Sequence, residues 1–183
     1  MKKRYLVDIF ILLSVILIFP GCSTISKTDT SEQFIKTTID SANEYNSNEQ
    51  YDLALEVYNS ALQSVSDYRL IYNKALVLAY MGQYAEAAEI CQEGFEDYNY
   101  ILAFKTAQAY YYTLDDNNEK ACDTYLEILD LNPYDTTTRN SLINIYKEQG
   151  KYDKALEQAF IMWNQGYKTA SNLSLIKELQ SLL

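Results

Sequence analysis

Apolar residues along most of this chain recur at the spacing of one face of a helix. After Ala54, apolar side chains follow four, seven and eight positions later, at Tyr58, Ala61 and Leu62. Such i, i+4, i+7, i+8 spacing is typical of the buried face of an amphipathic helix. No segment alternates apolar and polar residues long enough to predict a strand, and only five glycines and two prolines interrupt the chain. The pattern predicts an all-α protein.

One of these helical patterns returns along the chain. Its copies are EQYDLAL at 49–55, GQYAEAA at 82–88 and GKYDKAL at 150–156. Their second-helix alanines, Ala54, Ala87 and Ala155, are separated by 33 residues and then by twice 34. A fourth copy is therefore expected at 121, where the sequence has Ala121. The chain contains an internal repeat of about 34 residues.

A 34-residue period of paired helices resembles the tetratricopeptide repeat (TPR). The resemblance runs from about residue 35 to the end of the chain. It implies a right-handed superhelix, an α-solenoid of about four helix-turn-helix repeats with a C-terminal capping helix. The expected repeats are 35–67, 68–98, 99–133 and 134–168, followed by a capping helix over 169–183.

Within each repeat the resemblance implies two antiparallel helices, A and B, that cross at small residues. The expected crossing residues are Ala42, Ala75 and Ala107 in helices A, and Ala54, Ala87, Ala121 and Ala155 in helices B. Gly82 and Gly150 are expected in the turns between A and B. The third repeat departs from the pattern, because Asn118 replaces the tyrosine of the motif, and about two extra residues are expected around TLDDNN.

The segment 169–183 has its own apolar spacing. Leu173, Ile176, Leu179 and Leu183 fall on one predicted helical face. A terminal helix that covers the exposed end of the stack explains this face. A helix that docks a partner, or half of a truncated fifth repeat, remains an alternative.

The amino terminus is basic and then apolar. Lys2, Lys3 and Arg4 precede an apolar run over 9–19, which is short for a membrane span and suits a signal peptide. The run ends in FPGC at 19–22, which resembles the lipobox of bacterial lipoproteins. The resemblance implies a signal peptide over 1–21, a lipidated Cys22 and a flexible tether over 22–34. A signal peptide without lipidation, an uncleaved anchor and a buried core helix are the alternatives.

The charge of the chain limits its partners. Without residues 1–21 it carries 12 Lys and Arg against 24 Asp and Glu, a net charge of −12. Phosphates and anionic headgroups repel such a body, so we expect no nucleic-acid partner and attachment to a membrane only through lipid. The expected location is the bacterial cell envelope. Ser23 after the cysteine is compatible with the periplasmic side of an outer membrane, if the source has two membranes.

The sequence offers little catalytic chemistry. It has no histidine, no CxxC pair, no GxGxxG and no P-loop pattern. We therefore expect no enzyme, no cofactor and no metal. Cys91 is expected to be a small buried residue of a helix B, and a disulfide between Cys91 and Cys122 is left open.

If helices A line a groove, as in the family, the resemblance places eleven residues along it. They are Asn43, Tyr72, Leu76, Tyr80, Phe104, Gln108, Tyr111, Tyr112, Asn140, Asn144 and Lys147. The tyrosines offer large contact area with a polar tip, which suits a protein or peptide partner. A carboxylate clamp of the kind known in some family members would use Asn43, Asn73 and Lys105. Ile39 and Ile101 replace its other two polar residues, which argues against it.

Two functions remain open at this stage. The first is a membrane-anchored scaffold that binds another protein or peptide, for example in envelope or outer-membrane assembly. The second is a receptor for a small ligand or peptide that is associated with a transporter. An enclosed pocket near Tyr72, Tyr80 and Tyr111 would favour the receptor, and an open groove would favour the scaffold.

Overall fold

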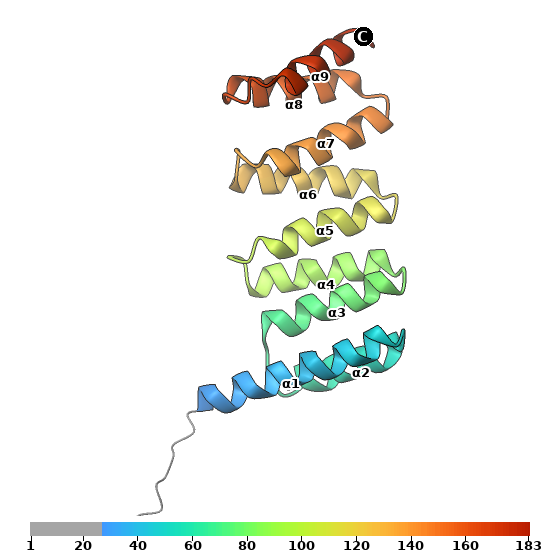
Figure 1. Cartoon of the computed structure of the whole chain (residues 1–183), viewed down its shortest axis with the longest axis vertical. Coiled ribbons are helices and arrows are strands. Elements are labelled where there is room, and N and C mark those ends of the chain that lie inside the picture. The colour runs from blue at the N-terminus through green and yellow to red at the C-terminus, as the bar shows by residue number, and fades with distance from the viewer. Residues whose placement is uncertain (1–26) are drawn as a thin grey trace, which may run out of the picture.

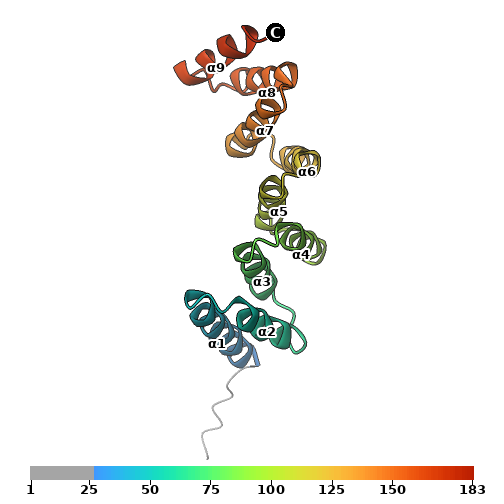
Figure 2. The ribbon, with the colours of Figure 1, turned by 90° about the vertical axis from the view of Figure 1, so that its right-hand side faces the viewer.

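The computed structural model describes residues 27–183, which form one stack of antiparallel helices (Figure 1). The helices are α1 (Lys27–Ser47), α2 (Tyr51–Leu62), α3 (Tyr68–Tyr80), α4 (Tyr84–Asp97), α5 (Ala103–Leu114), α6 (Asn118–Leu131), α7 (Thr136–Glu148), α8 (Tyr152–Asn164) and α9 (Ala170–Gln180). Each helix packs against the next one in the chain, and this range contains no strand. The predicted all-α helical-repeat fold is confirmed. Helices α1, α3 and α5 lie on one side of the stack and α2, α4 and α6 on the other (Figure 2).

Every turn from a helix A to a helix B has the same backbone. One residue with a left-handed conformation stands two positions after each helix A ends: Glu49, Gly82, Asp116 and Gly150, with φ of 58°, 76°, 56° and 68°. The next N–H closes the turn onto a helix carbonyl, as from Gln83 to Leu78 at 2.9 Å. The two glycines therefore lie where the sequence predicts them. The expectation of extra residues in the third repeat is wrong, because its turn is as short as the others.

Small residues at the helix crossings hold the stack together. Ala54, Ala87, Ala121 and Ala155 are all completely buried. Small side chains let helix axes approach closely, so that ridges of one helix pack into grooves of the next. The four equivalent alanines thus occupy like surroundings, as the repeat requires.

The two ends of the stack differ from the expectation in detail. Helix α1 begins at Lys27, so the tether expected over 22–34 is helical from that residue. The guanidinium of Arg69 on α3 donates to both carboxylate oxygens of Glu32, which ties this extension to the second repeat. The expected lipidation site, Cys22, and the expected signal peptide over 1–21 lie outside the described residues.

At the other end, α9 packs against α8 as a capping helix would. Ile176 and Leu179 are buried, but Leu173 and Leu183 are exposed, so the predicted apolar face is wrong at these two positions. Asn172 is buried in their place, and its side chain donates to the Tyr167 carbonyl at 3.1 Å. Among residues 27–183, no helix combines the length and apolar character needed to cross a bilayer.

Helices α4 and α5 approach closely at Gly94. A Cβ atom there would stand 2.5 Å from the ring of Phe104, whose side chain is fully buried. We expect Gly94→Ala to lower the free energy of unfolding by about 1–3 kcal/mol, because the added methyl overlaps a ring that cannot move away. This loss outweighs the better helix propensity of alanine. Denaturant unfolding measures it. With Phe104→Leu the same change should cost less, and equal costs in both backgrounds would exclude the ring contact as the cause.

The two cysteines of the described chain, Cys91 and Cys122, are free and buried. Burial raises the pKa of the Cys91 thiol to about 12. Since only the thiolate reacts, we expect Cys91 to resist iodoacetamide at pH 8 in the folded chain and to react in urea. Mass spectrometry of the alkylated peptides measures this. Rapid alkylation of native Cys91 at pH 8 would contradict the packing described here.

Candidate functional site

The outer surface of α1, α3, α5 and α7 is the candidate site, and we call it the A-helix face. Repeat-equivalent positions define it, so one set runs through Asn43, Leu76, Tyr110 and Asn144. All four are exposed or half-buried. The face is thus a continuous stripe that crosses all four repeats.

Three of the eleven predicted groove residues meet in one hollow of this face. Asn43 on α1 and Leu76 and Tyr80 on α3 line a space of about 320 Å³, together with Asn46, Ser47 and Tyr51. The rings of Tyr51 and Tyr80 stack with their centroids 6.1 Å apart and an angle of 26° between planes. Because Tyr80 remains 57% exposed, its ring offers a partner a fixed apolar surface with a polar tip. The hollow combines aromatic contact with amide hydrogen-bonding groups.

Helix α7 contributes three more of the predicted residues. Asn140 and Asn144 are exposed on the face. Lys147 is half-buried, and its ammonium donates to Glu178 of α9 at 2.7 Å. Lys147 therefore links the last repeat to the capping helix, and its charge is balanced within the protein.

The four residues predicted on α5 do not lie on the face. Phe104, Gln108, Tyr111 and Tyr112 are only 0–5% exposed and belong to the interior. Burial accordingly raises the pKa of Tyr111. Tyr72, on α3, is half-buried and packs edge-on against Phe104 at 5.8 Å between ring centroids. The prediction of these α5 residues as groove residues is wrong.

A shift of two residues in the assumed register explains this error. The residue 34 positions after Ala75 is Ala109, which is completely buried, whereas Ala107 had been assigned to the crossing. With Ala109 at the crossing, the α5 residues expected on the face are Thr106, Tyr110 and Leu114; all three are exposed, Tyr110 by 54%. The strict 34-residue period would have found them.

The positive charges near the face are bound to carboxylates. Arg69 pairs with Asp67 and Glu32, and these hydrogen bonds lower the pKa of both carboxyls. Lys105 forms an ion pair with Glu127 of α6, beside the ring of Phe95. Lys105 thus lines a hollow with residues of α4 and α6, away from Asn43. The structure does not bring the residues of a carboxylate clamp together.

The side chains of the A-helix face supply contact area and hydrogen-bonding groups. No group of three or more metal-ligating side chains comes together within residues 27–183. Burial raises the pKa of both Cys91 and Cys122, which keeps these thiols protonated at neutral pH. What the face offers is exposed tyrosine and leucine, with asparagine amides between them.

No protein-family model matches the chain, and no curated protein sequence matches it. Solved structures do match. A TPR protein from Parabacteroides merdae ATCC 43184 superposes with a TM-score of 0.65 at 16% identity, covering 81% of this chain and 61% of that one. MamA from Desulfovibrio magneticus RS-1, from residue 41 to its end, superposes with a TM-score of 0.62 at 11% identity. This match covers 81% of this chain and 84% of that one.

A third similar structure is YrrB, described as a TPR protein with an unusual peptide-binding site. Its TM-score is 0.58 at 19% identity, and the match covers 82% of this chain and 84% of YrrB. The identities are too low to carry more than the fold. The paired helices, their common turns and these superpositions agree that the chain has the tetratricopeptide-repeat fold.

Proposed function

We propose that this chain is a lipid-anchored scaffold of the bacterial cell envelope, which binds a protein or peptide partner through its A-helix face. The observation that carries the proposal is the hollow at Asn43, Leu76 and Tyr80. It opens onto a stripe of exposed side chains that continues through Tyr110 to Asn144. A small molecule needs no such length of surface, whereas an extended segment of a partner does.

The physical fit is to a polypeptide. Asparagine amides can donate to and accept from the main chain of an extended segment, and tyrosine rings bury its side chains at a low cost in rotamer entropy. The hollow is open to solvent, and Tyr111 is not part of it. By the criterion set from the sequence, this favours the scaffold over the small-ligand receptor. The description of YrrB as a peptide-binding protein of the same fold supports the same choice.

Lipidation of Cys22 would hold this face close to a membrane. Residues 23–26 separate Cys22 from the first residue of α1, so the anchor lies at most about 17 Å from Lys27. A diacylglyceryl group with a third acyl chain exceeds the two signals needed for stable anchoring. The scaffold acts by binding alone: it raises the local concentration of its partner at the membrane, without catalysis, cofactor or metal.

Site-specific photo-crosslinking tests the binding face. We expect a benzoylphenylalanine in place of Tyr110 to trap a discrete partner in native envelopes. The same probe at Tyr134, which is also well exposed but lies in the α6–α7 connection, should not. Asn43→Ala with Tyr80→Ala should reduce the yield at 110 about tenfold, because both side chains are exposed and the fold does not need them.

Stability measurements separate binding from folding in this experiment. Tyr111→Ala removes a buried ring and should cost about 3–5 kcal/mol, whereas the double variant should lose only the Tyr51–Tyr80 ring contact, about 0.5–1.5 kcal/mol. Equal crosslinking at 110 and 134, or an undiminished yield in the stable double variant, would refute the A-helix face as the binding surface.

Anchoring has a separate test. We expect Cys22→Ser to move the protein out of the membrane fraction and to abolish its labelling by an alkyne-tagged fatty acid. Cys122→Ser is the matched control and should keep both, since that thiol is buried. If Cys22→Ser remains in the membrane without label, the amino terminus is an uncleaved anchor instead.

A further inference from the structure

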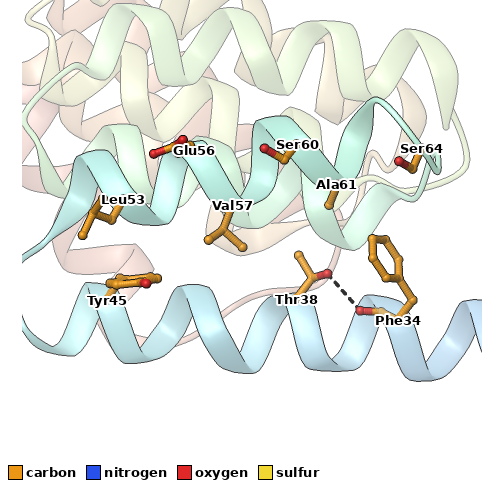
Figure 3. A pocket seen from close by; sticks show the side chains of 9 residues that line it. All are labelled: Phe34, Thr38, Tyr45, Leu53, Glu56, Val57, Ser60, Ala61 and Ser64. Carbon is orange, nitrogen blue, oxygen red and sulfur yellow. Dashed lines mark hydrogen bonds between the residues drawn. The ribbon is translucent and has the colours of Figure 1, made fainter.

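A second hollow lies between α1 and α2, on the side of α1 away from the A-helix face. We call it the first-repeat groove; it measures about 540 Å³ and is lined by Phe34, Thr38, Tyr45, Leu53, Glu56, Val57, Ser60, Ala61 and Ser64. Figure 3 shows Phe34 and Tyr45 at its two ends, with Leu53 and Val57 pointing into it from α2. Leu53 and Phe34 are each 41% exposed. The groove is an open and mostly apolar surface.

The same groove exists in later repeats, but there a helix of the preceding repeat reaches it. Tyr45 and Leu53 correspond to Tyr112 and Lys120 in the third repeat, 67 positions on. Those two residues line a hollow that also contains Gln92, from the preceding helix α4. In the fourth repeat the corresponding hollow is lined in part by five residues of the preceding helix α6. In the described part of the chain, no helix precedes α1.

One position of the groove is exposed in all four repeats, but only the first repeat has an apolar residue there. Where the first repeat has Leu53, the next three have Glu86, Lys120 and Lys154. Lys120 and Lys154 lie over the rings of Tyr112 and Tyr146, at 5.1 and 5.6 Å from the ring centroids.

Phe34 shows the change in part: its equivalents in the second and fourth repeats are the helix-capping Asp67 and Asp135, whereas the third repeat has the apolar Ile101. The end of a repeat stack normally has a polar outer face. In the first repeat Leu53 is apolar at a position where the later repeats, which are exposed there too, have charged residues. This composition indicates that another surface covers the groove in the functional state of the protein.

The rim of the groove is acidic at one end. Glu56 lines the groove, and the exposed Glu44 and Asp52 are the sequence neighbours of its lining residues Tyr45 and Leu53. None of these three carboxylates has an ion-pair partner among residues 27–183, and Lys36 of α1 is paired with Asp40. An occupant with basic flanks would neutralise these carboxylates.

We propose that the first-repeat groove binds an amphipathic helix of a partner protein, with an apolar stripe and basic flanks. The helix takes the place that a preceding helix B occupies in the later repeats. Phe34 and Tyr45 are eleven residues apart, or about 16 Å along α1, so the groove accommodates three turns of the partner helix. The matching stripe has apolar residues at i, i+3 or i+4, i+7 and i+11. This surface is distinct from the A-helix face and does not depend on the function proposed for it.

None of the described helices B has more basic than acidic residues, so none of them supplies the basic flanks. Helix α4 carries five acidic and no basic residues, and α9 carries one lysine beside one glutamate. The charge of the rim therefore favours a different protein over a second copy.

A synthetic peptide tests the groove directly. The probe is a 14-residue helical peptide with leucines at the four stripe positions and lysines on the flanks. Two controls are a scrambled peptide of the same composition and one with glutamates on the flanks. Binding is measured by fluorescence anisotropy to the full chain in phosphatidylcholine nanodiscs, with empty nanodiscs as the blank. We expect the basic amphipathic peptide to bind at least tenfold more tightly than either control.

Substitutions taken from the later repeats test whether the peptide binds in the groove. Leu53→Lys with Val57→Thr copies the residues of the third repeat, Lys120 and Thr124, which this fold accommodates. The double variant should lose at least tenfold in affinity, whereas Leu131→Lys, at an exposed leucine outside the groove, should not. Asp52→Asn with Glu56→Gln should weaken binding and reduce its dependence on salt. Hydrogen exchange should slow in α1 and α2 when the peptide binds.

Several outcomes would overturn the proposal. Equal affinity for the three peptides, or unchanged affinity in the Leu53→Lys, Val57→Thr variant, would show that the groove does not select such a helix. If sedimentation shows an oligomer that the same double variant converts to a monomer, the occupant is a second copy. Slow hydrogen exchange at the groove without peptide and without an oligomer would show that another part of this chain covers it.

Discussion

The fold depends on close contact between helices at one small residue in each repeat. Ala54, Ala87, Ala121 and Ala155 are buried completely, and each lies where helix B crosses its neighbours. Any larger side chain at these positions would push the helices apart along their whole length. Larger core residues on the same helix faces, such as Tyr58 and Ile128, are each fully buried against neighbouring helices. They pack there because the helix backbones are already close. The repeated alanine is therefore the constraint, and the rest of each helix follows from it.

The period could be read from the sequence because this constraint is the same in every repeat. The turns follow the same period. Each has a left-handed residue at the equivalent place, even where that residue is Glu49 or Asp116, which tolerate this conformation less well than glycine. Sequence reasoning failed where it trusted a residue type over the period. Asn118 stands where the other motifs have tyrosine, and the inferred insertion moved the register of α5 by two residues. A helix turns by 100° per residue, so that error placed buried residues on the candidate site and hid Tyr110.

Other features could not be predicted from the period, because they depend on contacts between repeats. The helical extension of α1 before Ile35 has no apolar stripe of its own and is held by the pairing of Arg69 with Glu32. The exposure of Leu173 and Leu183 has a similar cause. Helix α9 has a neighbour on one side only, so the apolar spacing of a short segment could not show which of its residues that neighbour covers.

A stack that grows in one direction leaves two kinds of surface, its sides and its ends. The sides are repeated, so a partner bound along the A-helix face contacts equivalent positions that differ only in their side chains, from Asn43 to Asn144. The ends occur once each, and within residues 27–183 they differ. Helix α9 packs on the last repeat, whereas no described helix covers the apolar groove of the first repeat. Since the later repeats have charged residues at the equivalent exposed position, the repeat itself does not require Leu53 to be apolar. The difference must then arise from what the first-repeat groove contacts outside the described fold, and this makes the end of the stack, as much as its side, a surface for recognition.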